Sequence, residues 1–137
     1  MNRYTYEEIE NGHKEQFEVE ITSEMLDRFC EITGDCNPMH SDEAYAASKG
    51  YKGRICYGML TASFLSTLAG MYIPGERSLI HSVETIFKNP VYVGDTLTVI
   101  GEVASKNDNF KVLELKVQIV NQDGKKVVRG KMQVGVL

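Results

Sequence analysis

The sequence predicts a single α+β domain, residues 1–137, in which an antiparallel β-sheet wraps around one long central α-helix. The stretch Ile55–Ile73 contains no charged residue, which is typical of a helix buried in the middle of a protein. Segments with strand patterns follow this stretch consecutively along the chain. Hairpin signals at residues 106–109 and 121–124 separate the last three of them, so neighbouring strands should run antiparallel.

The composition is that of an ordinary globular domain. Of the 137 residues, 42% are hydrophobic and 25% are charged. The net charge of −4 gives no general attraction for nucleic acid or for an anionic membrane, and we expect neither as a partner. The uncharged stretch is long enough to cross a membrane, but its serine, threonine and glycine residues favour a buried helix.

The three cysteines, Cys30, Cys36 and Cys56, are odd in number and lack the paired spacing of a metal site. We therefore expect free thiols, a reducing cytoplasmic location and no bound metal. The N-terminus, residues 1–10, is polar and acidic, unlike a signal peptide, which agrees with that location.

The first predicted elements are a strand and a helix. Residues 17–21 alternate between apolar and polar side chains, which is the period of a half-buried strand. Thr22 or Ser23 can cap the helix that follows, whose apolar residues recur at helical spacing. Gly34 should end this helix, because glycine readily adopts the left-handed conformation found after helices.

A polar loop and a short helix come next. Pro38 disfavours helical geometry at Asn37, so residues 35–40 should form an ordered loop. The short helix should be capped near residue 42 and end near Gly50.

The central helix should span about residues 58–72, with Pro74 closing it. Four more strands are predicted, at residues 78–88, 96–104, 112–120 and 126–134. One small sheet around one helix leaves a sheet edge and part of the helix uncovered, and a second copy would cover both. We therefore expect a homodimer or a dimer-based higher oligomer.

The densest group of polar residues is the loop after the first helix. It holds Asp35 and His40, a carboxylate and an imidazole of the kind that deprotonates a water molecule and protonates a carbon atom. Aspartate is equally common in turns with no catalytic role, so these residues by themselves leave both interpretations open.

A second candidate feature is the start of the central helix. The first N–H groups of a helix are unpaired and carry partial positive charge, and Gly58 leaves room for a ligand carbonyl to approach them. Such donors can stabilise the enolate-like oxygen that forms when a nucleophile adds to an α,β-unsaturated thioester. By itself, Gly58 can also simply ease the start of a helix.

The two features occur together in a recognisable order. The motif Gly34-Asp35-x-Asn37-Pro38-x-His40-x-Asp42, followed by Gly58-Met59-Leu60 and Ser63, resembles the (R)-specific enoyl-CoA hydratases of the MaoC-like dehydratase family, which has the hot-dog fold. The later segment Phe87-x-x-Pro90-Val91-x-Val93-Gly94-Asp95 is similar to that family's strand–turn–strand segment. The resemblance runs from about Thr22 to Val134.

The resemblance implies a role for each matching residue. Asp35 and His40 match the catalytic pair that activates water for addition at C3 of a trans-2-enoyl thioester and delivers a proton at C2. Gly58 matches the glycine whose N–H polarises the thioester carbonyl. The substrate-binding residues expected on this basis are Asn37, Gly58, Met59 and Ser63. Many relatives have a histidine where this chain has Tyr57, a departure that bears on substrate choice and on packing at the helix start.

The implied reaction gives an (R)-3-hydroxyacyl thioester and is reversible. No cofactor is implied, because coenzyme A or an acyl-carrier pantetheine is part of the substrate. Two other functions remain open: a hot-dog acyl-CoA thioesterase, which would aim its water at the thioester carbonyl carbon, and a non-catalytic acyl-thioester-binding subunit. The Asp-x-Asn-Pro-x-His loop argues against the thioesterase, and the retention of both polar residues argues against the binding subunit.

Overall fold

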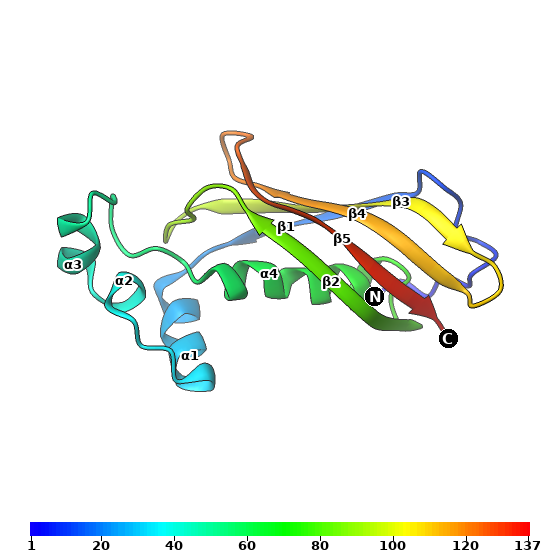
Figure 1. Ribbon diagram of the computed structural model, residues 1–137, viewed down its shortest axis with the longest axis horizontal. Helices are drawn as coiled ribbons and strands as arrows, with labels where there is room; N and C mark the ends of the chain where they lie inside the picture. The colour runs from blue at the N-terminus through cyan, green and yellow to red at the C-terminus, as the bar shows by residue number, and fades with distance from the viewer.

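The computed structural model of the chain, residues 1–137, contains one five-stranded antiparallel sheet with the strand order β1-β3-β4-β5-β2. The strands are β1 (Lys14–Glu20), β2 (Ser78–Phe87), β3 (Thr96–Asn107), β4 (Val112–Val120) and β5 (Lys126–Val136). The helix α4 (Gly58–Thr67) lies along one face of this sheet (Figure 1). This is the predicted α+β arrangement, in which a sheet wraps around a central helix.

The long helix spans the predicted residues but changes its geometry near its end. After α4 the chain continues as one π-helical turn, η1 (Leu68–Tyr72), before Pro74. Leu68 packs so closely on the sheet that a Cβ at Gly101 of β3 would lie 2.7 Å from its Cδ2 atom. Only glycine at this position in β3 permits that contact, which seats the helix end against the sheet.

The other three helices form an arm beside one end of the sheet (Figure 1). They are α1 (Ser23–Thr33), α2 (Pro38–Ser41) and α3 (Glu43–Ser48). The prediction of an ordered loop over residues 35–40 is wrong in part, because Pro38 begins the four-residue helix α2. A proline fits the first position of a helix, where its missing N–H has no helical partner to lose.

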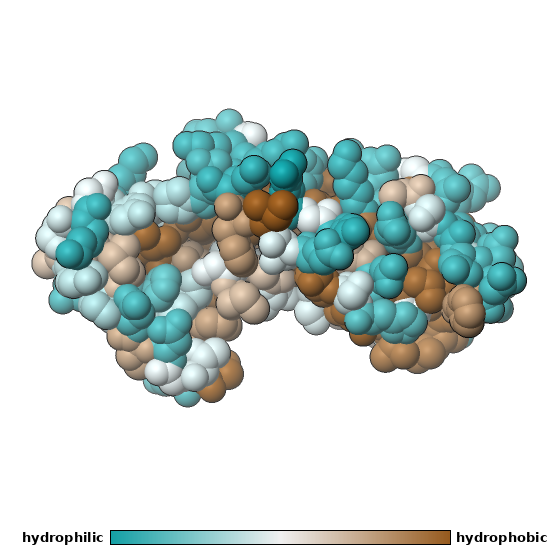
Figure 2. All heavy atoms as spheres, viewed as in Figure 1, coloured by the Kyte–Doolittle hydropathy of each residue, from teal (hydrophilic) through white to brown (hydrophobic).

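One side of the central helix is exposed in a single copy of the chain. Leu65, Leu68 and Ala69 face the sheet and are buried, whereas Met59 and Met71 are 66% and 44% exposed. Figure 2 shows brown, apolar residues along the lower edge of the molecule, on the side of the sheet that carries α4, while the upper edge is mostly teal. No helix in the structure is both long and apolar enough to cross a membrane.

The prediction of three free thiols is wrong for two of them. Cys30 and Cys36 form a disulfide bond, with their Cα atoms 5.4 Å apart, and only Cys56 is a free thiol, buried in the core. Gly34 makes this bond possible, because its left-handed conformation (φ 76°) ends α1 and turns the chain back toward Cys30.

Candidate active site

The polar loop is turned by its own side chains. A carboxylate oxygen of Asp35 accepts the backbone N–H of Asn37 at 3.1 Å, and the Asn37 side chain accepts the N–H of Met39 at 2.9 Å, which caps α2. These two local hydrogen bonds are typical of Asx turns. They carry the chain from Asp35 into α2, where His40 lies in the last turn.

The ring of His40 is held in one orientation. Its Nδ1 atom lies 2.7 Å from the backbone carbonyl oxygen of Ile55. A carbonyl oxygen can only accept, so Nδ1 carries the hydrogen, and in the neutral ring Nε2 is left with a free lone pair. Arg54 fixes the same segment, because its Nε donates to the His40 carbonyl at 2.6 Å and its outer nitrogen donates to Asp27 at 2.6 Å.

Tyr57 brings the two predicted catalytic residues to one place. Its hydroxyl donates to the backbone carbonyl of Asp35 at 2.6 Å, and its ring stacks on the His40 ring with centroids 4.0 Å apart. Asp35 and His40, five residues apart in sequence, therefore both contact the residue that precedes the central helix.

The start of α4 presents unpaired backbone donors. No side chain caps this helix, and Thr61 is the first residue whose N–H reaches back, to the carbonyl of Tyr57. The N–H groups of Gly58 and the next two residues thus have no helical acceptor. A Cβ at Gly58 would lie 3.1 Å from the ring of Phe87, so glycine allows this ring to lie against the backbone.

A cavity of about 350 Å³ joins these features. Both His40 and Gly58 line it, and seven of its 13 lining residues are hydrophobic, including Ile55 and Phe87. Cys56 also lines this cavity, but burial raises the pKa of its thiol to about 11, so the thiol is protonated and non-nucleophilic at neutral pH.

The other predicted site residues lie outside the cavity lining. Asp35 is exposed and reaches the site through Tyr57. Asn37 is exposed and caps α2, Met59 is 66% exposed, and the Ser63 hydroxyl donates to the Leu60 carbonyl at 2.6 Å. A substrate-binding role for Asn37, Met59 and Ser63 stays a prediction.

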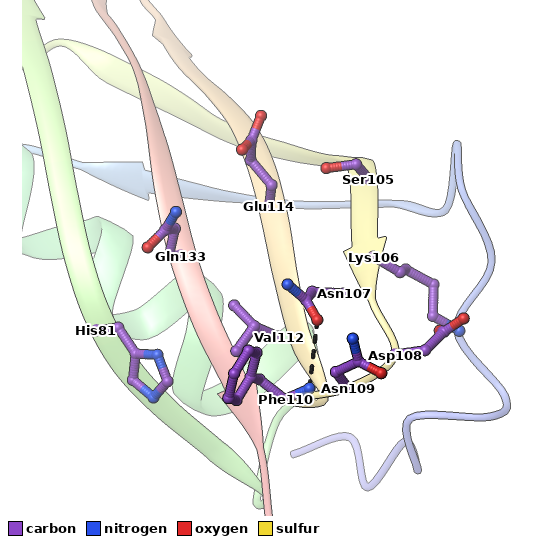
Figure 3. A pocket seen from close by; sticks show the side chains of 10 residues that line it. All are labelled: His81, Ser105, Lys106, Asn107, Asp108, Asn109, Phe110, Val112, Glu114 and Gln133. Atoms are coloured by element: carbon purple, nitrogen blue, oxygen red, sulfur yellow. Dashed lines mark hydrogen bonds between the residues drawn. The ribbon is translucent and has the colours of Figure 1, made fainter.

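A larger cavity, of about 730 Å³, lies at the far end of the sheet (Figure 3). Figure 3 shows its side chains spread around the β3–β4 hairpin and the outer faces of β4, β5 and β2, with His81 and Gln133 among them. Only two of its ten lining residues are hydrophobic, and none is a predicted site residue. The smaller cavity combines apolar walls with convergent polar groups, as binding sites for small molecules do.

Comparison with known proteins gives consistent matches over most of the chain. Residues 5–125 match the MaoC like domain family. The (R)-specific enoyl-CoA hydratase of Aeromonas caviae is 32% identical over 126 residues, which cover 92% of this chain and 94% of the relative. The 3-hydroxybutyryl-CoA dehydratase of Methylorubrum extorquens is 38% identical over 99 residues, covering 72% of this chain and 63% of that protein.

Solved structures agree with the sequence matches. The unliganded R-hydratase of Pseudomonas aeruginosa superposes with a TM-score of 0.92 at 33% identity, covering 96% of this chain and 84% of that one. The (R)-hydratase of Aeromonas caviae involved in PHA biosynthesis gives a TM-score of 0.91, covering 94% and 98% of the two chains. With its hot-dog fold and a family match over residues 5–125, the chain belongs to the MaoC-like dehydratase family.

Proposed function

We propose that this chain is a hydro-lyase that adds water reversibly to trans-2-enoyl-CoA and forms (R)-3-hydroxyacyl-CoA. The observation that carries the proposal is the cavity that His40, with its free Nε2 atom, and Gly58, at a helix start with unpaired N–H groups, both line. Tyr57 contacts both the backbone of Asp35 and the His40 ring, which supports the pairing of these two residues. The similarity to an (R)-specific enoyl-CoA hydratase over nearly the whole chain supports the same reaction.

The proposed mechanism needs only these groups and one water molecule. The Asp35 carboxylate and Nε2 of His40 bind the water and take one of its protons, while its oxygen bonds to C3. The electron pair of the C2–C3 double bond moves toward the thioester, whose oxygen becomes negative and is stabilised by the Gly58 N–H. The proton is then delivered to C2, which completes the addition of one water and regenerates the pair.

The substrate would supply the only non-protein group. Coenzyme A, or an acyl-carrier pantetheine, is attached to the acyl chain, and the proposed steps need neither a metal nor a redox cofactor. The apolar cavity walls suit the acyl chain, because they remove its surface from water. Asn37, Met59 and Ser63 are proposed to contact the substrate, as the family motif implies.

We also propose that the chain works as a homodimer paired through β2. This edge strand exposes apolar side chains, Val83 at 43% and Ile86 at 50%, and its outer backbone groups have no partner strand in one copy. A second copy would cover this edge and the exposed side of α4, where Met59 lies. An acyl-CoA substrate favours a cytoplasmic location.

The test is hydration of crotonyl-CoA by the purified protein, followed through the loss of its conjugated enoyl absorbance. We expect Asp35→Asn and His40→Asn each to lower kcat/KM by at least about 100-fold. Asparagine at position 40 can still donate to Ile55 but has no group in place of Nε2. The melting temperatures should therefore stay close to that of the parent.

The outcomes separate the competing functions. Formation of the (R) alcohol by the parent, shown by chiral analysis, supports the hydratase. Near-parental turnover in either variant would show that the assigned pair is wrong. Release of free CoA thiol would instead identify a thioesterase. Binding without turnover, with CoA and acyl-carrier thioesters alike, would identify a non-catalytic binding subunit.

A further inference from the structure

Tyr57 lies where the polar loop meets the start of the central helix. It is the residue before Gly58 and is only 3% exposed. Its ring packs against two other rings: the centroid of Phe29 is 4.9 Å away at an interplanar angle of 48°, and that of His40 is 4.0 Å away at 29°. The Tyr57 ring thus packs against one residue of α1 and one residue of α2.

The hydroxyl of Tyr57 makes a specific hydrogen bond in addition to this packing. It donates to the backbone carbonyl of Asp35 at 2.6 Å, across 22 residues of sequence. Burial, and then the negative charge of Asp35, raise the pKa of the Tyr57 phenol. The phenol therefore remains protonated, and remains a donor, throughout the neutral pH range.

Three parts of the proposed site meet at this one residue. Its hydroxyl holds the backbone of Asp35, its ring holds the imidazole of His40, and its own backbone leads directly into Gly58. Asp35 itself is exposed, and its carboxylate is engaged only within its own loop, by Asn37. The contact with Tyr57 is therefore the hydrogen bond that joins Asp35 to the residue before the central helix.

We propose that Tyr57 is a positioning residue, which sets the spacing between Asp35, His40 and the N–H of Gly58 for the hydration reaction. This inference rests on the proposed function. Tyr57 acts through its neighbours and not on the substrate. Its hydroxyl is the informative group, because phenylalanine would pack against the same two rings but could not hold the Asp35 carbonyl.

The two contributions can be separated by substitution. Tyr57→Phe removes only the hydrogen bond. Asp35 is an exposed residue, so water can replace the phenol at its carbonyl, and the cost to folding should be small. Tyr57→Leu also removes the aromatic stack on His40. Tyr45→Phe is the matched control, because Tyr45 is a partly exposed tyrosine on α3 outside the cavity.

The experiment measures kcat and KM for crotonyl-CoA together with the melting temperature. We expect Tyr57→Phe to lower kcat about tenfold, since small displacements of reacting groups are costly, while KM and the melting temperature change little. Tyr57→Leu should lower kcat further, and Tyr45→Phe should match the parent. In NMR spectra, Tyr57→Leu should shift the ring protons of His40, which the stacked phenol shields in the parent.

A double variant tests whether Tyr57 acts through Asp35. If it does, adding Tyr57→Phe to Asp35→Asn should cause almost no further loss of kcat, because the group being positioned is already disabled. Full kcat in Tyr57→Phe, or an equal further tenfold loss in the double variant, would overturn the positioning role and leave the proposed function intact. A parent without hydratase activity would overturn the proposed function, and the positioning role with it.

Discussion

At Gly58 the backbone and the ring of Phe87 are in direct contact. An added Cβ would lie 3.1 to 3.3 Å from three carbon atoms of that ring, which is tighter than ordinary packing. The ring is about half exposed and can move aside, so the fold should survive. The methyl group would nevertheless enter the cavity beside the N–H that is proposed to bind the thioester oxygen.

We therefore predict that Gly58→Ala lowers kcat/KM for crotonyl-CoA by at least about tenfold, but by no more than the loss of one oxyanion-hole donor would. The melting temperature should change little. The control is Gly70→Ala, near the other end of the same helix. There a Cβ would meet nothing closer than 3.9 Å, and the backbone is not left-handed, so activity should be unchanged. Equal activity of Gly58→Ala and Gly70→Ala would show that the N–H of Gly58 does not act as proposed.

At the scale of residues, the sequence proposes which side chains take part in catalysis but does not show how they are held in place. Asp35 and His40 belong to a short motif, so their association could be predicted. The contact of Tyr57 with Asp35 joins residues 22 positions apart and depends on how α4 meets the loop. The sequence marks Tyr57 only as a departure from the family. Every residue type has a backbone carbonyl, so the sequence does not indicate which residue accepts a hydrogen bond of this kind.

The loop that carries Asp35 is also closed covalently. The disulfide joins Cys30 in α1 to Cys36, six residues later, and Asp35 lies inside this short loop. A loop of this length stabilises the folded state by roughly 2 kcal/mol in the chain-entropy model. In a reducing cytoplasm, disulfides are uncommon and mostly transient. The redox state of the Cys30–Cys36 disulfide therefore bears directly on the proposed cytoplasmic location.

We predict that reduction of this disulfide lowers the melting temperature by several degrees and lowers kcat about three- to tenfold, because the Asp35 backbone gains freedom. The unfolded oxidised protein should show one reactive thiol, from Cys56, and three after reduction. The Cys30→Ser/Cys36→Ser variant is the control and should not respond to reductant. An activity loss of the same size in that variant on adding reductant would mean that the reductant acts elsewhere.

At the scale of elements, nearly every helix and strand lies where the patterns predict it. Buried and exposed side chains alternate along β4, and hairpin signals lie on either side of it. Both features are local in sequence, so this strand could be predicted directly. The exceptions depend on contacts distant in sequence or on covalent chemistry. The π-helical turn η1 ends α4 where Leu68 packs against Gly101, and the disulfide requires the turn at Gly34 to bring two cysteines together.

At the scale of the whole molecule, the two edges of the sheet differ in character. Strand β1 is seven residues long and places charged or polar side chains at every second position, which discourages pairing with another strand. Strand β2 is ten residues long and exposes apolar side chains over most of its length. An uncovered edge of this kind is a site for pairing with a second strand.

The proposed dimer therefore predicts an effect of charge on β2 alone. We expect the Val83→Lys/Ile86→Lys variant to have half the parent's mass by light scattering, because the lysines of the two copies would repel each other across the paired edge. The lysine at position 83, which lies opposite the buried Met132, would also have to be desolvated. Val93→Lys is the matched control: Val93 is 40% exposed, close to the 43% of Val83, but it lies in the connection between β2 and β3. A parent that is already monomeric would contradict the proposed dimer, and a β2 variant that keeps the parent's mass would place the contact between copies away from β2. Dissociation confined to the β2 variant would instead identify β2 as the strand through which the two copies pair.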